Sequence, residues 1–390
     1  MAGATPRWSG LVQADFQASQ ASRDQLADGS GAPLNQDAFT LRRGRLRAED
    51  EVDWTAYVIE ADFNTVDGPQ AGFRQIEGTL RWAGTGALDG LTVRLGAGVI
   101  PIPFGHAVAG ERDADRLFTE RPVFADALFP GQLDAGARLV VGYGAARLIV
   151  AVQNGEPLGE AAWPGVDPNA AKDVTGRIEA AAPLSARVRL EGGLSALSGE
   201  GFHAGTPPTK ERLQWRDLNE DGIAQPSEIS TLPPSAGTPS AGFDRFGLGA
   251  DLRVIVEIAG LGALVVGAEG ALATNLDRGL RPADPVRGGR DQRAVGGAVA
   301  VTQALGPVDV GVRADVYAPH LDATEVRAGG TVRADERWTT WTATVGARVG
   351  AGGRLIAEYR RQRDTLGRDA AGRPADLEND VVVGRLQVGF

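Results

Sequence analysis

The sequence contains no cysteine, which excludes disulfide scaffolds, thiolate metal sites and cysteine nucleophiles. It also lacks any apolar run approaching the roughly 18 residues that a membrane-spanning helix needs. A chain of this kind could cross a bilayer only as a closed barrel, because a barrel satisfies its backbone hydrogen bonds between its own strands. A length of 390 residues would suggest two or three soluble domains, but it suits a single barrel.

Lysine is nearly absent, because Lys172 and Lys210 are the two lysines among 40 basic residues. Arginine presents a planar fork to anions, whereas lysine is a hydrated point charge. The bias fits anion recognition, and it fits equally a GC-rich genome that favours arginine codons. The 50 acidic residues give a net charge of −10, which argues against a nucleic-acid partner.

The first residues carry neither the basic start nor the apolar stretch of a secretory leader. Trp8 already begins a segment in which apolar and polar residues alternate. We therefore expect that a leader peptide has been removed and that Met1 stands in its place.

Alternating segments recur along the whole chain and predict β-strands, with no competing helical period. Tight turns and long polar loops separate them in alternation, and two loops, 100–134 and 199–242, are very long. Short turns on one rim and long loops on the other are typical of outer-membrane barrels, with the turns in the periplasm. The sixteen expected strands are 8–19, 38–48, 52–63, 73–82, 91–99, 135–143, 145–154, 173–182, 186–198, 243–258, 262–274, 292–304, 308–317, 334–349, 354–363 and 379–390.

Turn-forming residues predict five of the tight connections, at 49–51, 144, 183–185, 306–307 and 350–353. An even number of strands places both ends of the chain on the periplasmic side.

The last strand shows which way the faces point. Leu386, Val388 and Phe390 share one face, whereas Arg385 and Gln387 share the other. Sixteen strands enclose a lumen too wide for side chains to fill, so we expect the apolar face in lipid and the charged face in water. The sequence thus predicts an all-β protein in which residues 1–390 form a single domain, a 16-stranded antiparallel transmembrane β-barrel.

Ordered short motifs carry a family resemblance from about residue 38 to 155. They are FTLRRGRL at 39–46, ADF at 61–63, GVIPIPFG at 98–105, TERP at 119–122 and QNG at 153–155. Glu358-Tyr359-Arg360 and a terminal Phe390, of the kind recognised by the barrel-assembly machinery, extend the likeness more loosely. In these motifs the chain resembles the phosphate-selective porin family (porins O and P).

The resemblance implies a homotrimer of 16-stranded barrels in which the third long loop, 100–134, folds inward as a constriction. In the family, an arginine ladder and lysines near the constriction govern phosphate passage. Neither Lys172 nor Lys210 lies in this loop, so the lysine cluster has no counterpart. Arginines that share a strand face could form the ladder, or could be ordinary lumen charges opposite carboxylates. The candidate pore residues are Arg43, Arg45, Arg47, Arg112, Asp113, Asp115, Arg116, Glu120, Arg121, Arg187 and Arg189.

A calcium-binding pattern, D-x-N-x-D-G-x5-E, occupies residues 217–228 in the long loop 199–242. Side-chain oxygens, one carbonyl and a bidentate Glu at the twelfth position would surround Ca²⁺, and Gly222 permits the sharp turn. Pro226 suggests a structural clip rather than a paired sensor module; an acidic surface loop is the alternative. The expected ligands are Asp217, Asn219, Asp221, Ile223, Gln225 and Glu228.

Catalytic patterns are missing. His106, His203 and His320 lie in separate loops without partner spacing, and no Ser/His pair supports a barrel hydrolase. We expect a non-enzymatic porin of the bacterial outer membrane, in contact with its lipid, that passes small hydrophilic solutes or ions. The alternatives are an anion- or phosphate-selective channel and a calcium-dependent surface-binding β-barrel protein.

Overall fold

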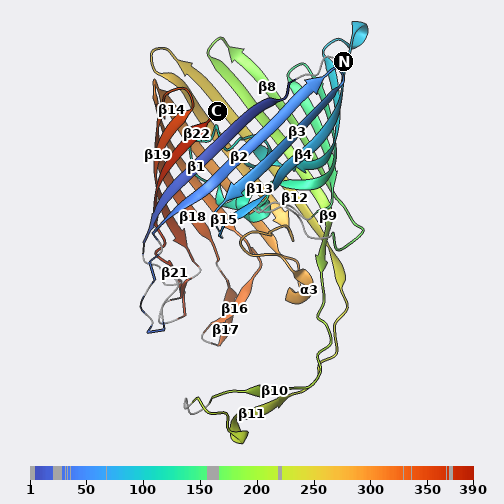
Figure 1. Cartoon of the computed structure of the whole chain (residues 1–390), viewed down its shortest axis with the longest axis vertical. Helices are drawn as coiled ribbons and strands as arrows, with labels where there is room; N and C mark the ends of the chain where they lie inside the picture. The colour runs from blue at the N-terminus through green and yellow to red at the C-terminus, as the bar shows by residue number, and fades with distance from the viewer. Residues whose placement is uncertain are drawn as a thin grey trace.

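A computed structural model describes residues 5–20, 29–30, 32, 34–35, 37–66, 68–155, 167–217, 222–327, 329–334, 336–365, 367–368 and 372–390. In these residues, sixteen strands form one closed antiparallel barrel (Figure 1). Each barrel strand pairs with the next along the chain, and the last pairs with the first. The expected fold class is confirmed.

The barrel strands agree with the expected sixteen to within a few residues at most ends. Their bounds are β1 (Arg7–Ser19), β2 (Ala38–Val52), β3 (Thr55–Asn64), β4 (Gln70–Ala83), β5 (Leu91–Pro101), β6 (Leu133–Tyr143), β7 (Ala146–Gln153), β8 (Asp173–Ser185), β9 (Val188–His203), β12 (Ala241–Ile258), β13 (Gly262–Thr274), β14 (Arg293–Leu305), β15 (Val308–Ala318), β18 (Trp338–Val349), β19 (Gly353–Asp364) and β22 (Val381–Gly389).

Two expected turns are wrong. Residues 49–51 continue β2, where Glu49 pairs with Arg7 and Arg47, and the chain turns at Asp53 instead. Residues 183–185 continue β8, because a register shift after Pro183 accommodates a residue that cannot donate to a regular ladder. The turns at 144, 306–307 and 350–353 are confirmed, each with a glycine at positive φ.

Short elements in the loops were not expected from the sequence. Three small hairpins and several one-turn helices occur there, and no helix in the described part of the chain is long and apolar enough to cross a membrane. The hairpins lie beyond the rim opposite the short turns, and the β10–β11 hairpin reaches farthest (Figure 1). The loop elements are η1 (Gly86–Leu88), α1 (Gly105–Ala109), α2 (Val123–Leu128), β10 (Arg212–Trp215), η2 (Pro226–Glu228), β11 (Ile229–Leu232), α3 (Pro285–Gly288), β16 (Thr324–Arg327), β17 (Gly330–Arg333), β20 (Gly367–Arg368) and β21 (Pro374–Ala375).

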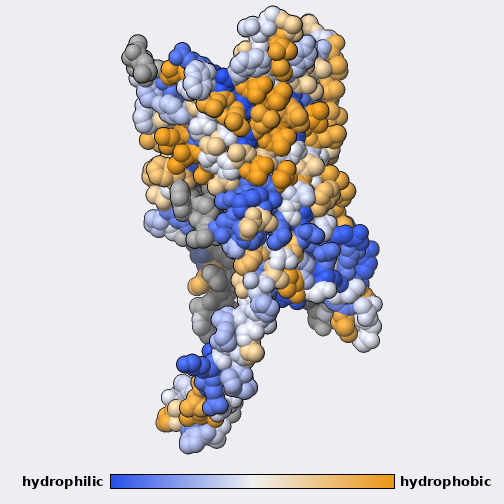
Figure 2. Space-filling view, turned by 90° about the vertical axis from the view of Figure 1, so that its right-hand side faces the viewer, coloured by the Kyte–Doolittle hydropathy of each residue, from blue (hydrophilic) through white to orange (hydrophobic). Residues whose placement is uncertain are grey.

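The barrel wall is apolar outside and polar inside, the reverse of a soluble core. In β22, Leu386 and Phe390 at its end are exposed, whereas Arg385 and Gln387 are buried toward the lumen, as expected. Figure 2 shows hydrophobic side chains gathered over the barrel wall and hydrophilic ones gathered toward the long loops. Such a wall is compatible with lipid around it and with water inside it.

Arginine placed on the outer face should therefore destabilise the barrel. Val299 lies in the middle of β14 and is 54% exposed. Val299→Arg should lower the free energy of unfolding by roughly 2–4 kcal/mol in lipid, because the charge would face hydrocarbon. Urea unfolding in liposomes measures this. Thr302→Arg, on the lumen face of the same strand, is the control, and an equal loss from both variants would contradict the assignment of the faces.

Candidate functional site

The segment 102–132 connects β5 to β6 and packs against the inner side of the barrel wall, while residues 100–101 and 133–134 of the expected loop belong to these two strands. One side of it is hydrophobic: Phe104, Phe124 and Phe129 pack in one buried cluster with Leu197 of β9 and Tyr317 of β15. Helix α1 contacts β9, β12 and β13, and α2 contacts β14 and β15. This half of the loop is therefore fixed to one side of the wall by apolar packing.

Glu120 fixes the other half of the loop by ion pairs. Its two carboxylate oxygens accept hydrogen bonds from Arg42 Nε (2.7 Å) and Arg42 Nη2 (3.0 Å). Arg43 Nη2 and Arg385 Nη2 add contacts of 3.1 and 3.4 Å. The side chains of Arg43 and Arg385 are 0% and 2% exposed, so Glu120 compensates buried charge from both β2 and β22.

Asp113 is a second ionic anchor of the loop. Its carboxylate contacts the guanidinium groups of Arg45 on β2 and of Arg116 in the loop itself. Arg43 Nε and Arg74 Nη2 lie 3.7 and 3.8 Å from its oxygens. All of these side chains are buried or nearly so, so the cluster is a buried ion-pair network and not a solvated surface.

Wall side chains also bind the loop backbone. Ser195 Oγ accepts from Gly105 N (3.0 Å), and Glu269 Oε2 accepts from Ala107 N (2.9 Å). Glu358 accepts from Thr119 N at 2.8 Å. Since these acceptors come from β9, β13 and β19, the loop is held around much of the barrel circumference.

The loop between β13 and β14 also contacts the constriction loop. Arg278 N and Gly279 N donate to the carbonyl of Ala127 at 2.9 and 2.8 Å. The Tyr317 hydroxyl donates to Asp277 Oδ2 at 2.5 Å. Burial raises the pKa of Asp277 above its usual value, although the hydrogen bonds from Tyr317 and from the backbone act in the opposite direction.

The arginines expected as a ladder have different surroundings. Arg43 and Arg45 are buried anchors of the loop, while Arg47 is 31% exposed and pairs with Glu49 and Glu60. The other two lie near the short-turn rim, where Arg187 is in the β8–β9 turn and Arg189 pairs with Glu191 at 3.0 Å. The structure therefore does not bring all five into one open row.

The remaining loop charges divide between the surface and the interior of the segment. Arg112 and Asp115 are exposed and pair with each other at 2.8 Å. Arg116 is buried beside Asp113, and Arg121 pairs with Asp126 at 2.8 Å.

Sequence reasoning missed several wall residues that hold the loop, chiefly Arg42, Arg385, Glu358 and Glu269. Alternation could show that Arg385 faces inward. Nothing in the pattern could show which inward charges meet the loop, because that depends on how distant strands are brought round the barrel.

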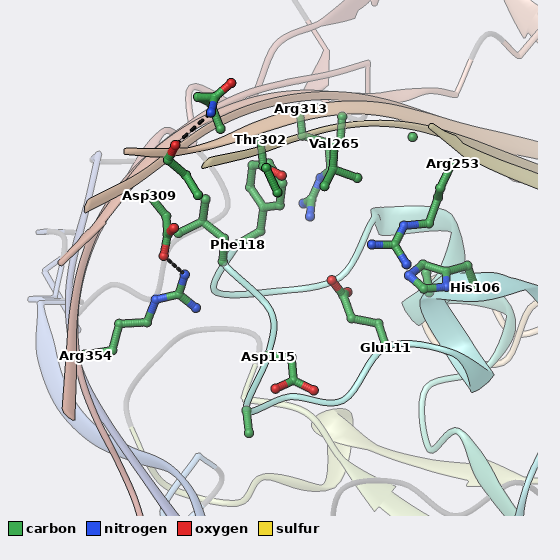
Figure 3. A pocket seen from close by; sticks show the side chains of 18 of the residues that line it. His106, Glu111, Asp115, Phe118, Arg253, Val265, Thr302, Asp309, Arg313 and Arg354 are labelled. Carbon is green, nitrogen blue, oxygen red and sulfur yellow. Dashed lines mark hydrogen bonds and ion pairs between the residues drawn. The ribbon is translucent and has the colours of Figure 1, made fainter. Parts of the chain in front are cut away.

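Two cavities remain beside the loop, of about 670 and 320 Å³. Glu111 and Ala114 line both, so this part of the loop separates them. In the larger cavity, Glu111 and Asp115 extend from the loop, and Arg253 and Arg354 extend from the opposite wall (Figure 3). Charges of both signs thus border the open space, and the smaller cavity also contains Arg47.

The described part of the calcium-type segment, 217 and 222–228, lies in the long β9–β12 loop between β10 and β11. Asn219 and Asp221 fall outside the described residues. Gly222 has φ +73°, and its N–H donates to Asp217 Oδ2 at 2.7 Å. Gln225 is the N-cap of η2, and Glu228 at the third position of η2 accepts from Gln225 N (3.3 Å) and Trp215 Nε1 (3.1 Å). Within the described residues, no three Asp, Glu or His side chains gather as a metal-binding group.

Removing the Glu120 charge tests the anchoring of the loop. Glu120→Gln should lower the free energy of unfolding by about 3 kcal/mol, because Arg42 would lose its bidentate carboxylate and the buried Arg43 would lose its closer carboxylate and keep Asp113, at 3.7 Å. Urea unfolding measures the loss, and protease cleavage within 102–132 should become faster. Asp115→Asn is the control, since this exposed pair should contribute below ~1 kcal/mol. Equal losses from both variants would contradict the anchor.

Comparisons with known proteins show the fold of the chain. No protein-family model matches it, and no curated protein matches its sequence. Among solved structures it is similar to an anion-selective porin from Comamonas acidovorans (TM-score 0.56, 10% identity, 99% of each chain). It is also similar to the outer membrane channel DcaP of Acinetobacter baumannii (0.55, 12%, 100% of this chain and 98% of that one). A third is the trimer form of OmpT, an outer membrane protein of Vibrio cholerae (0.54, 11%, 99% of each chain). The chain therefore has the fold of outer-membrane porins with a 16-stranded barrel.

Proposed function

We propose that the protein is a porin of the bacterial outer membrane, a passive channel for small hydrophilic solutes or ions. The observation that carries the proposal is a charged, partly open lumen inside a closed barrel with an apolar outer wall. The anchored loop narrows this lumen without filling it. We assign no catalytic role, and the similarity to a porin and to an outer membrane channel supports this reading.

We also propose that the protein assembles as a homotrimer and discriminates weakly between simple ions. The trimer form of the similar Vibrio cholerae protein supports the first point. For the second, four arginines and five carboxylates line the larger cavity, so neither sign predominates. An anion- or phosphate-selective channel is the second candidate, which the sequence motifs favour. The engagement of Arg43 and Arg45 by loop carboxylates counts against it.

Planar-bilayer recording of the purified protein tests the channel. We expect stepwise conductance in groups of three, with a reversal potential close to zero in a KCl gradient. Glu111→Gln and Arg348→Gln each remove one charge from the larger cavity, so they should shift the reversal potential in opposite directions. A lack of conductance across many insertions would contradict a porin. A large reversal potential with the sign of anion selectivity would favour the second candidate.

We propose separately that residues 217–228 bind one Ca²⁺ as a structural clip on the long outer loop. The spacing of the motif is the main support. The left-handed Gly222, its bond to Asp217 and the placement of Glu228 in the first turn after Gln225 agree with such a loop. A calcium-dependent surface-binding protein, with the barrel only as support, would use the same loop.

Asp217→Ala combined with Glu228→Ala should abolish calcium binding, because both ends of the ligand set are lost. Calorimetric titration of the detergent-solubilised protein with CaCl₂ measures it. Glu211→Ala removes an exposed carboxylate from the same arm but outside the motif, and it should leave binding unchanged. Undiminished binding by the double variant would contradict the site. Unchanged conductance in the absence of calcium would show that the channel does not depend on the clip.

A further inference from the structure

Two neighbouring strands interrupt the charged lining of the lumen. Toward the short turns, both strands border the larger cavity with lumen-facing residues. These are Ala263, Val265 and Gly267 of β13 and Ala300, Thr302 and Ala304 of β14. None of these six side chains is charged. This stretch of the two strands forms an uncharged wall in an otherwise ionic lumen, and Glu269 lies on the lumen face of β13 beyond it.

The strand register places two arginines on either side of this wall. Arg253 pairs with Gly267, Gly267 with Ala300, and Ala300 with Arg313. At ~4.8 Å between strands, the backbones of the two arginines are about 14 Å apart. The adjacent row toward the short turns contains Ile255, Val265, Thr302 and Gly311 and has no charge.

On the strands beside this wall, the exposed charges that line the cavity are those of arginines. Arg253 has 30% of its side chain exposed and bonds Glu191 through Nη1 at 3.2 Å. Arg348 is 52% exposed. Asp251 and Asp309 are instead buried, Asp251 against Arg177 and Asp309 against Arg348 and Arg354.

The remaining charged groups beside the wall are already engaged. The Glu269 carboxylate accepts from the backbone of the loop at Ala107. Arg313 is buried, donates to Asp315 and to the Glu120 carbonyl, and lies over the Phe118 ring. Arg253 is therefore the accessible cation that borders the uncharged rows most directly, and the exposed Glu257 lies beside Ala263 at their short-turn end.

The loop side of the cavity has the opposite sign. Glu111 and Asp115 project from the loop across from Arg253 (Figure 3). Both carboxylates disfavour an anionic group at the loop, and Arg112 (2.8 Å from Asp115) and Arg116 (3.9 Å from Glu111) offset part of this repulsion. A cavity of about 670 Å³ is within the range of sites for small organic ligands.

We propose that this cavity is a binding site for small amphiphilic carboxylates on their way through the pore. The apolar body lies on the β13–β14 wall, and the carboxylate pairs with Arg253. The inference rests on the proposed channel function and names a solute class for it. The inference is compatible with weak selectivity among simple ions, because binding at this site needs an apolar body beside the charge and simple ions have none.

Benzoate and acetate, as sodium salts, are the probes, compared by permeability from bilayer reversal potentials. Benzoate should permeate faster than acetate, although it diffuses more slowly in water. Val265→Asn should lower the benzoate-to-acetate ratio by roughly fourfold, the effect of one methylene-sized apolar contact. Arg253→Gln should lower benzoate permeability, and Arg47→Gln in the smaller cavity should not. If Val265→Asn fails to insert, Ala300→Asn tests the same wall.

Three results would overturn the inference: a benzoate-to-acetate ratio no higher than their ratio of mobilities in water, a ratio that the wall variants leave unchanged, or faster passage of benzylammonium than of benzoate. A protein that conducts KCl and acetate but shows any of these remains a porin without this site. A protein that conducts neither salt refutes the channel itself.

Discussion

Closure of the sheet between its first and last strands is the constraint on which the rest depends. β1 and β22 pair from Leu11 with Gly389 to Ser19 with Val381, which leaves no unpaired edge along this seam. The constriction loop is tied to the same seam. Gln13 donates to the Asp113 carbonyl, and Arg385 bonds both Asp15 and the Thr119 carbonyl. The position of the loop is therefore set by strands that lie at opposite ends of the sequence.

The lumen combines two ways of holding a segment inside a barrel. Apolar packing around Phe104 and Phe124 is non-directional and fixes the depth of the loop. The ion pairs of Glu120 and Asp113 are directional and fix its lateral position. Buried ion pairs contribute little net stability compared with apolar packing, yet a single unpaired partner is strongly destabilising. The network is consequently better suited to specifying one loop position than to stabilising the barrel as a whole.

Much of the fold could be predicted from local alternation, because each strand in a wide barrel meets lipid on one face and water on the other. The faces of β22 and the inward course of 100–134 followed from that pattern and from the resemblance. The turn near Asp53 did not, since cross-strand ion pairs of Glu49 extend β2 past its acidic residues. The partners of Arg43 and Arg45 were also beyond reach, because they are set by long-range register. The calcium-type segment is a local pattern, so sequence alone could suggest it.

The β13–β14 pair, in which Glu269 and Arg293 are the two charged residues, has a consequence for how the barrel acquires its register. A slip by one residue exchanges the lipid and lumen faces of a strand, which ordinarily exposes charge to hydrocarbon. In these two strands most residues on both faces are small or apolar, so such a slip would encounter little penalty from polarity. Their alignment must instead come from neighbours with strongly polar faces, Arg253 on β12 and Arg313 on β15, and from the tight turns at Gly260 and Gly306. Correct assembly of this sector therefore follows from the strands beside it.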